Sequence, residues 1–564
     1  MEPGTTWLQT KSPGRPTGRL LLVQTTWFEN YGSWGFAGEF LQYGGQADEV
    51  AGEFWIGDAE IRCASSCAHT YGKTKVWAEA LTSSGGHYTY YPGNLKRRAD
   101  WALAEGINAF ILHVYIQQQD DNAYPGVDAW YNVQFNCKNT WFSQLDLYTD
   151  YIRRCGFLLQ KGVDVSDVAY FIGEDAPKMS GITTPTTPEG YHYDHINSEV
   201  LLYDATVIDG KLVLPHGTSY RVLVLPPQDD IRPEVFTKIE RFAEAGLPVI
   251  ATVRPVRSPS LENYPEADGQ VQKIAARLWD NKKILHTTVA DFFKNELNLP
   301  PDFVATSPEI HYTHRKYGDT DIYFITNQSD RRIQAAPVFR VSGKQPELWN
   351  PVTGKIRPLP AYEYGNSNTT SVPLQLEANE SVFIVFRRDA KPSAVNSLAS
   401  NFPEQKTLAE INSAWTVTFE SDEIKRAPSQ PVTFEKLSDW SKHSDERIKY
   451  FSGTAGYKTS FNLGQKPDAE LYLDLGRVVA MAKVKINGQY AGGVWTAPYR
   501  VDIAPYVNSG KNEVEIEVVS TWANRIIGDR KLPEEQRKLQ ISRGPKGDLH
   551  ESGLLGPVRI ITGY

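Results

Sequence analysis

The segment from Lys75 to Gly86 decides the fold and reads Lys-Val-Trp-Ala-Glu-Ala-Leu-Thr-Ser-Ser-Gly-Gly. Its apolar first half is typical of a buried strand that carries Glu79 to its carboxyl end, and a loop of small polar residues follows. A helical segment over 94–105 comes next, then a second apolar run over 107–115 that contains His113. This order is the βαβ pattern. Because chemistry in parallel α/β architectures lies at the carboxyl ends of strands, Glu79 and His113 are the first candidates for a site.

Short strands and helices continue to alternate on both sides of this segment. The run 36–40 is predicted to be a strand that ends near Glu39, and Asp58 is placed to cap a helix that runs to His69. Residues 139–160 show the amphipathic pattern of another helix. A parallel α/β unit is therefore expected over residues 1–164.

Composition limits the classes of function. A chain of 564 residues is too long for one core, so several domains are expected. The net charge of -8 offers no electrostatic case for a nucleic-acid partner. No apolar run approaches the length of a membrane-spanning helix, so no membrane partner is predicted. Four cysteines are too few for a disulfide framework, and Cys63 and Cys67 are expected to pack in a core.

Three further units follow along the chain. Residues 165–303 alternate buried-type strands with helices, which predicts a flavodoxin-like doubly wound domain, and they lack the glycine spacing of a phosphate-binding loop. Residues 304–390 show short strands and predict a small β-sandwich. The pattern over 403–564 alternates cleanly, and Asn487-Gly488 is a strong hairpin signal, so a C-terminal jelly-roll is expected. The fold class is therefore multidomain α/β plus all-β.

Several motifs carry a resemblance to a known family. They are Gly38-Glu39, Asp48-Glu-Val-Ala-Gly-Glu-Phe-Trp55, Ala68-His-Thr-Tyr-Gly-Lys73, Ala78-Glu-Ala80 and Glu105-Gly-Ile-Asn108. Together they resemble glycoside hydrolase family 106, the α-L-rhamnosidases, over roughly residues 36–253. The segment 487–495 is similar to the galactose-binding-like sandwich that many glycosidases carry, which is weak evidence for substrate.

The resemblance implies a mechanism and a site. The family uses a (β/α)8 barrel and inverts the anomeric centre with two carboxyl groups about 6.5–9.5 Å apart, one acting as acid and one as base. The Ala-Glu-Ala motif assigns the general base to Glu79. The general acid of the family lies in an Asp-Ser-x-Glu motif more than a hundred residues upstream of the base, and this chain contains no such motif. Calcium near the sugar is expected, with Glu39, Asp48, Glu49 and Glu53 as the candidate cluster.

The spacing also predicts an incomplete barrel. Only three barrel strands are predicted from the sequence, ending near Glu39, Glu79 and His113, and residues 1–160 are too few for the roughly 200–250 residues of a whole barrel. We therefore expect an N-terminally truncated chain or a misassigned start, with the N-terminal part of the barrel as a candidate partner. On this reading the chain alone is catalytically impaired.

Each site residue has a functional and a structural reading. Glu79 is expected to be catalytic, the alternative being a strand-end carboxylate that pairs with Lys73 or Lys96. The residues expected to contact substrate, each of which has a structural alternative, are Glu39, Glu53, Trp55, His113 and Asp194.

The structural alternatives differ from residue to residue. Glu39 and Glu53 could instead form ordinary ion pairs, although Glu39 is also the nearest candidate to replace the missing acid. His113 could be a satisfied core histidine, Trp55 could be core, and Asp194 could be a turn residue.

The expected function is the inverting hydrolysis of terminal α-L-rhamnosides in plant or algal polysaccharides or glycosides, with a rhamnose-containing carbohydrate as the partner. Two alternatives stay open, a non-catalytic carbohydrate-binding protein and one fragment of a split glycosidase. The compartment is left open, because no signal-peptide pattern is visible, whereas complete members of the family are expected to be periplasmic or extracellular.

Overall fold

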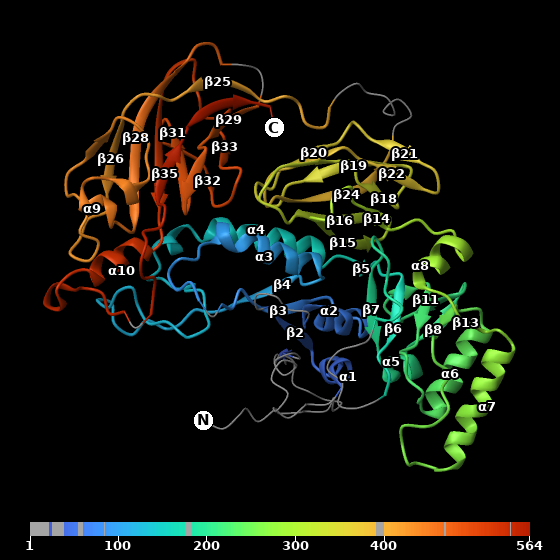
Figure 1. Cartoon of the computed structure of the whole chain (residues 1–564). Coiled ribbons are helices and arrows are strands. Elements are labelled where there is room, and N and C mark those ends of the chain that lie inside the picture. The colour runs from blue at the N-terminus through green and yellow to red at the C-terminus, as the bar shows by residue number, and fades with distance from the viewer. Residues whose placement is uncertain are drawn as a thin grey trace, which may run out of the picture.

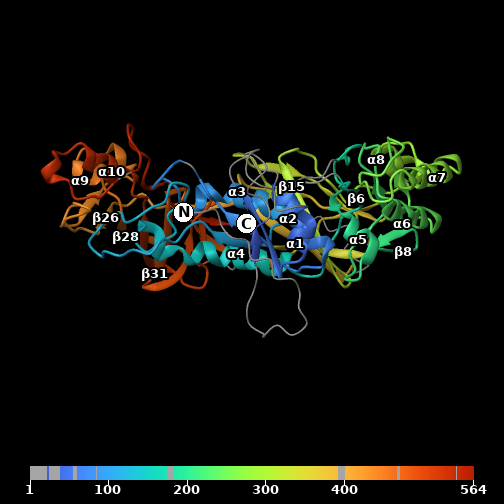
Figure 2. The same cartoon turned by 90° about the horizontal axis from the view of Figure 1, so that it is seen from below.

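The computed structural model describes residues 22–24, 39–54, 60–83, 85–174, 183–390, 400–466, 470–541 and 543–563. These residues form a multidomain α/β and β-rich molecule (Figure 1). Seen from below, the molecule is elongated, with the C-terminal β unit at one end and helices α6 and α7 at the other (Figure 2). No helix among the described residues is long and apolar enough to span a membrane.

The first unit is a four-stranded parallel sheet whose strands lie side by side in chain order. Helices connect successive strands, as the βαβ pattern predicts, and α3 ends beside Glu105 as expected from the sequence. The elements are β1 (Leu22–Gln24), α1 (Phe40–Gly45), β2 (Glu49–Phe54), α2 (Glu60–Thr70), β3 (Val76–Ala80), α3 (Pro92–Ala104), β4 (Ala109–Leu112) and, after a 3-10 turn η1 (Thr140–Gln144), α4 (Asp146–Leu159).

Alternation of side chains gives this sheet two different faces. Val50 and Ala78 point into the core shared with the helices, whereas Glu53 and Glu79 lie on the opposite face, at paired positions of β2 and β3. Strand β2 was not predicted, because its glutamates Glu49 and Glu53 look like surface residues in a linear sequence. Their spacing of four residues places both on one side of a strand.

Of the predicted strand over 36–40, residues 36–38 lie outside the described residues, and the described end is not a strand because Phe40 begins helix α1. Glu39 is the N-cap of helix α1, and its carboxylate accepts hydrogen bonds from the backbone N–H groups of Leu41 and Gln42 at 2.5 and 3.0 Å. A glutamate that precedes an apolar pair can satisfy the free N–H groups of a first helical turn as well as it can end a strand.

The second unit contains a five-stranded parallel sheet in the order β13-β12-β11-β6-β7. Numbered along the chain, this is the 2-1-3-4-5 order of flavodoxin-type sheets. Its elements are β6 (Val168–Phe171), β7 (Tyr193–Ile196), α5 (Ser198–Tyr203), β11 (Val222–Val224), α6 (Pro233–Glu244), β12 (Val249–Ile250), α7 (Glu266–Asp280) and β13 (Ile284–Leu285), with a small antiparallel sheet of β8 (Thr206–Ile208), β9 (Lys211–Val213) and β10 (Ser219–Tyr220). A short α8 (Val289–Asp291) and a π turn η2 (Phe292–Glu296) follow.

Two β-rich units complete the chain. The first has a six-stranded sheet, β20-β19-β24-β16-β15-β5, packed with a four-stranded sheet, β14-β18-β22-β21, around a common core. Strand β5 (Val163–Asp164) pairs with β15, so the end of the α/β unit is part of this sheet. The remaining bounds are β14 (Phe303–Val304), β15 (Ile310–Tyr317), β16 (Thr320–Asn327), β17 (Ile333–Ala335), β18 (Val338–Phe339), β19 (Lys344–Trp349), β20 (Ile356–Pro358), β21 (Glu363–Gly365), β22 (Thr369–Ser371), β23 (Leu374–Leu376) and β24 (Ser381–Asp389).

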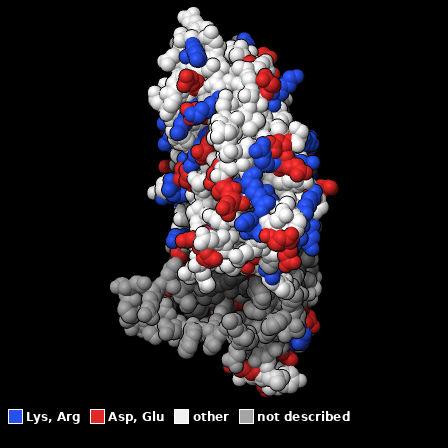
Figure 3. Space-filling model, turned by 90° about the vertical axis from the view of Figure 1, so that its left-hand side faces the viewer, with Lys and Arg blue, Asp and Glu red and all other residues white. Residues whose placement is uncertain are grey.

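The described residues of the C-terminal unit form three sheets, of four, six and two strands, around one core. The predicted hairpin is confirmed, because Asn487 and Gly488 both have positive φ between β31 and β32. Acidic and basic side chains alternate over the face in Figure 3. The bounds are β25 (Lys406–Glu410), β26 (Trp415–Phe419), β27 (Val432–Phe434), η3 (Trp440–Lys442), α9 (Glu446–Lys449), β28 (Thr454–Leu463), β29 (Leu471–Asp474), β30 (Arg477–Val479), β31 (Met481–Ile486), β32 (Gln489–Val494), β33 (Arg500–Asp502), β34 (Gly510–Val519), α10 (Ala523–Arg530), η4 (Glu534–Gln536), β35 (Gly553–Gly556) and β36 (Arg559–Thr562).

Buried contacts join the α/β unit to both β units. Lys96 on α3 donates to Asp100 at 2.5 Å and to Ser381 on β24 at 2.7 Å, and Tyr151 on α4 also donates to Asp100. Trp495 of the C-terminal unit packs against Tyr151 with ring centroids 5.1 Å apart. Helices α3 and α4 are therefore fixed on one side by the sheet of the α/β unit and on the other by the β units.

Candidate functional site

Glu79 lies near the carboxyl end of β3 on the face of the sheet away from the helices. Its side chain is 22 % exposed, and its Oε1 accepts a hydrogen bond of 2.6 Å from the Thr82 hydroxyl. His113, from the segment after β4, places Nε2 3.7 Å from the same oxygen. Among the described residues no contact occupies Oε2 of Glu79. The arrangement leaves one carboxylate oxygen available to accept a proton or to bind a hydroxyl group.

Neither lysine considered as a structural partner contacts Glu79. Lys73 donates to the carbonyl oxygens of Gly45 and Ala47 at 3.0 and 2.5 Å, and Lys96 is committed to the buried pair with Asp100. The structural alternative of an ion pair between Glu79 and Lys73 or Lys96 is therefore not what the structure shows.

His113 is held at this edge of the sheet by its backbone. Its N–H donates to the Ala80 carbonyl at 3.2 Å, and its carbonyl accepts from Val133 N at 3.1 Å. The side chain is 28 % exposed, so it is not a core histidine. Its Nδ1 is buried and has no hydrogen-bond partner among the described residues. The imidazole therefore has hydrogen-bonding capacity left beside Glu79.

Glu53 lies directly beside Glu79 on the neighbouring strand. The two residues are register partners of the parallel pair β2–β3, and such strands are about 4.8 Å apart. Glu53 is only 1 % exposed. The pair gives this face of the sheet two neighbouring carboxylate side chains.

Two loops continue from this end of the sheet and meet in a second polar cluster. His87, on the loop after β3, places Nδ1 3.1 Å from Oδ2 of Asp128, on the loop after β4. Gln134 accepts from Tyr88 N at 3.1 Å and approaches His87 with its amide nitrogen. Burial raises the pKa of Asp128, an effect that His87 and Arg543 offset only in part.

The structure places Glu39 and Asp194 elsewhere. Asn197 donates to Glu39 Oε2 at 2.6 Å, so both oxygens of this helix cap are occupied. Burial raises the pKa of Glu39, although the hydrogen bonds from Asn197 and the helix backbone oppose the shift. These contacts favour a capping role over contact with sugar.

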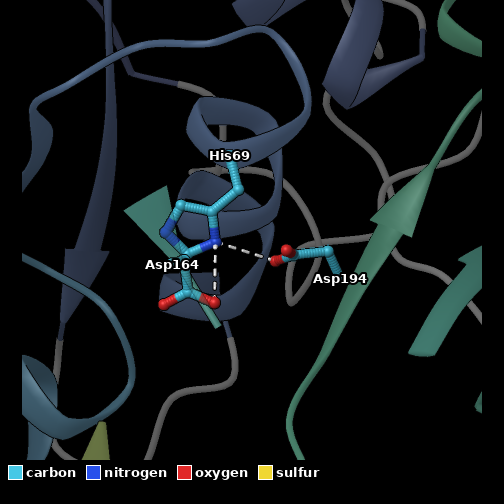
Figure 4. Close-up of side chains that lie close together, drawn as sticks. All are labelled: His69, Asp164 and Asp194. Atoms are coloured by element: carbon cyan, nitrogen blue, oxygen red, sulfur yellow. Dashed lines mark hydrogen bonds and ion pairs between the residues drawn. The ribbon is translucent and has the colours of Figure 1, made fainter. Parts of the chain in front are cut away.

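Asp194 is fully buried, so the prediction that it reaches the site from the doubly wound unit is wrong. Its carboxylate contacts His69 Nδ1 at 3.0 Å and accepts from the Tyr220 hydroxyl at 3.0 Å. Asp164 Oδ2 lies 3.7 Å from the same ring nitrogen (Figure 4). His69 is at the end of α2, before β3 begins, whereas Glu79 is near the end of β3.

The four carboxylates of the expected calcium cluster do not converge. Glu49, at the start of β2, pairs with Lys75 at 3.2 Å and accepts from Trp77 Nε1. Glu53 is four residues further along the same strand, about 13 Å away at the rise of a strand. Trp55 lies outside the described residues. The described residues that could gather around an ion are His69, Asp164 and Asp194, which already satisfy one another.

Sequence reasoning found Glu79 and His113 but missed their surroundings. Thr82 could have been found, because a hydroxyl residue three positions after a strand-end carboxylate is within reach of it. His87 and Asp128 are separated by 41 positions, and only the packing of the two loops reveals their contact.

Comparison with known proteins identifies similar chains. The family model described as alpha-L-rhamnosidase matches residues 23–364. The solved rhamnosidase of Novosphingobium sp. PP1Y is 32 % identical, with a TM-score of 0.86 over 93 % of this chain and 52 % of that one. A protein of Formosa agariphila named "Putative beta-glucuronidase" is 27 % identical over 92 % of this chain and 66 % of its own length. The chain thus spans about half of the first relative and two thirds of the second.

Proposed function

The chain belongs to the alpha-L-rhamnosidase family, glycoside hydrolase family 106, and from this membership we propose that it is a glycosidase that removes terminal α-L-rhamnose by inversion. The observation that carries the proposal is the environment of Glu79. This carboxylate is near the end of β3, contacts Thr82 and His113 through Oε1, and has no lysine or arginine partner among the described residues. The parallel strands β1 to β4, in chain order, support a partial (β/α)8 barrel as the scaffold.

In the proposed reaction Glu79 is the general base. A water molecule attacks the anomeric carbon from the face opposite the leaving group, and its proton passes to Oε2 of Glu79 as the glycosidic C–O bond breaks. The leaving oxygen takes its proton from a general acid. Thr82 fixes the rotamer of Glu79 by holding Oε1, and His113 provides a further polar group for the sugar or the water.

Glu53 is unsuited to be that general acid. At in-register positions of adjacent strands the two side chains start about 4.8 Å apart. An inverting reaction needs its acid and base on opposite faces of the sugar ring, whereas Glu53 and Glu79 project from the same face of the sheet on neighbouring strands. Because Glu53 is 1 % exposed, contact of its carboxylate with the sugar stays a prediction of the family resemblance.

Calcium stays a prediction of the family resemblance. Calcium takes six to eight oxygen ligands, whereas the adjacent carboxylates on this face are those of Glu53 and Glu79. No step of the mechanism is therefore assigned to the ion. If calcium binds, exhaustive chelation should lower the unfolding temperature of the protein and calcium should restore it. An unfolding temperature indifferent to chelator and calcium would remove this prediction.

The assignment is tested by substrate preference. The purified chain should hydrolyse an aryl α-L-rhamnoside faster than the matching aryl β-D-glucuronide, β-D-galactoside and α-L-fucoside. The glucuronide is the informative competitor, given the name of the Formosa relative. A clear preference for any of the other sugars would contradict the proposed specificity.

A second candidate function is that of one part of a split glycosidase. The observation in its favour is that the chain covers 52 % of the solved rhamnosidase while matching it over 93 % of its own length. This candidate predicts that the chain binds rhamnosides but turns them over only when a complementing polypeptide is added.

A further inference from the structure

Exposed apolar side chains occur along the segment that begins at the end of β4 and runs to Tyr131, and the rings of Trp130 and Tyr131 lie 6.2 Å apart. Trp130 is 65 % exposed and Tyr115 is 55 % exposed. Trp130 is the one tryptophan with a large exposed fraction among the described residues. The other exposed apolar residues of the segment 111–131 are Ile111, Val127 and Tyr131. Contiguous exposed apolar side chains often mark a binding surface, whereas single exposed ones are ordinary.

The exposed tryptophan is fixed in place by charged side chains. The guanidinium carbon of Arg543 lies 5.2 Å from the Trp130 ring centroid, and Arg543 Nη1 is 3.8 Å from Asp128 Oδ1. The Asp128 side chain is only 7 % exposed and is held in turn by His87 at 3.1 Å. A solvent-exposed tryptophan is normally free to change rotamer. Holding it against Arg543 of the C-terminal unit costs side-chain entropy, and binding of a ligand would account for that cost.

The segment around Trp130 lies at the same end of the sheet as Glu79. Val133 N donates to the His113 carbonyl, and Val114 N donates to the Val133 carbonyl at 3.0 Å, so the returning arm of the loop runs beside His113. Trp130 is three residues before Val133, which limits its Cα to about 11 Å from Val133. The ring is therefore near the candidate site, and its exposure places it at the rim.

We propose that Trp130, backed by Arg543, is a platform for the second sugar of the substrate, the ring to which the terminal rhamnose is attached. This inference rests on the proposed function. The reacting sugar needs a pocket that buries most of its surface, whereas a 65 % exposed ring suits a sugar that stays half in solvent. The open face of the indole packs on the apolar C–H face of that ring, and Arg543 keeps the indole from turning. Stacking depends on the shape of the sugar ring and on few of its polar groups. The platform therefore accepts neutral hexopyranoses of several kinds.

The test is calorimetric titration of the whole chain and of Trp130→Ala with two ligands, both proteins carrying Glu79→Gln so that rutinose is bound without being hydrolysed. Methyl α-L-rhamnoside contains only the terminal sugar, and rutinose contains rhamnose attached to glucose. We expect Trp130→Ala to bind rutinose about threefold to tenfold more weakly and to bind the methyl rhamnoside as the unchanged protein does. Trp130→Phe should keep most of the affinity for rutinose. Tyr203→Ala, which removes an aromatic ring that is 79 % exposed on α5, is the matched control.

The results separate the platform from the proposed function. Equal affinity of Trp130→Ala and the unchanged protein for rutinose would overturn the platform. Equal losses of affinity for both ligands would also overturn it, because Trp130 would then contact the terminal sugar or support the fold. If gentiobiose, a glucose disaccharide, binds as well as rutinose and with the same dependence on Trp130, the platform stands and the rhamnoside assignment fails.

Discussion

At the scale of single residues, the proposed activity depends on how the Glu79 carboxylate is held. One oxygen of its carboxylate is engaged by Thr82 and approached by His113, and both partners belong to the segments that follow strands β3 and β4. Thr82 is only 2 % exposed, so water cannot easily replace its hydroxyl group as the hydrogen-bond partner of Glu79. A buried neutral donor of this kind orients a carboxylate without neutralising it, which suits a general base.

This arrangement predicts the effect of removing the hydroxyl. Thr82→Val keeps the shape of the side chain and loses a hydrogen bond to a charged group, which is worth about 1.5–3 kcal/mol. Part of that loss should appear as a turnover of aryl α-L-rhamnoside lowered by roughly tenfold, with KM nearly unchanged. Thr149→Val on α4 is the control, since among the described residues the Thr149 hydroxyl bonds the Asp146 carbonyl of its own helix. Full turnover by Thr82→Val would mean that the contact is incidental.

At the scale of elements, the buried pair Lys96–Asp100 fixes α3 and α4 against the small β unit. Lys96 also donates to the Asn379 carbonyl and Ser381, and Asp100 accepts from Tyr151 and Thr326. Both charged side chains are 1 % exposed or less. Each charge is therefore tolerated only because the other and its hydrogen bonds are present.

Breaking the pair should destabilise the protein strongly. Lys96→Met leaves the Asp100 carboxylate buried and unpaired, and we expect the free energy of unfolding to fall by about 3–5 kcal/mol. The double variant Lys96→Met/Asp100→Asn should recover part of this loss. Urea unfolding followed by tryptophan fluorescence measures both. A double variant less stable than Lys96→Met would show that the hydrogen bonds of Asp100, rather than its charge, dominate.

The elements that could be predicted from sequence are those whose pattern is local. Strand β3, helix α3 and strand β4 follow from apolar runs, a helical segment and its stop, and Asn487-Gly488 follows from turn chemistry. Strand β2 was missed and Glu39 was placed on a strand, because an acidic residue in a short segment fits a strand face and a helix cap equally well. The burial of Asp194 depends on His69 and Tyr220, which no local pattern connects to it.

At the scale of the whole molecule, a buried charged cluster joins three units. His69 comes from α2, Asp164 from β5 in the sheet of the small β unit, and Asp194 from β7 of the doubly wound unit (Figure 4). Burial disfavours the charged form of His69, but Asp164 and Asp194 more than offset this effect and raise its pKa. Burial likewise opposes the charge of Asp164, yet His69 and Arg315 hold the pKa of that carboxyl at about 2.

The cluster predicts a pH dependence of stability. A raised histidine pKa stabilises the fold fully below its unfolded value of about 6.5, and this stabilisation is lost as pH rises through the folded value. The lowered pKa of Asp164 acts in the other direction, because its contribution is present above about pH 4 and is lost as pH falls toward 2. The unfolding temperature should therefore be highest between these limits and fall on alkaline titration.

A variant separates this cluster from His314, another buried histidine whose pKa is raised. His314, whose pKa the carboxylates of Asp302 and Asp321 raise to about 9 against the opposing effect of burial, also contributes to alkaline loss. His69→Gln should lower stability near pH 6 and flatten part of the decline between pH 6 and 9, leaving the share of His314. An unfolding temperature of His69→Gln that falls as steeply as that of the unchanged protein would show that His69 is not charged in the fold.

The most direct test of the central claim, that Glu79 is the catalytic base of a rhamnosidase, is the turnover of aryl α-L-rhamnoside by the unchanged chain, Glu79→Gln and Glu79→Ala, the last with added azide. We predict measurable turnover by the unchanged chain, a loss of roughly 10²–10⁴-fold in both variants, and restored release of aryl alcohol in Glu79→Ala with azide, with β-L-rhamnosyl azide as product. Turnover by Glu79→Gln equal to that of the unchanged chain, or an α-configured azide, would contradict the assignment.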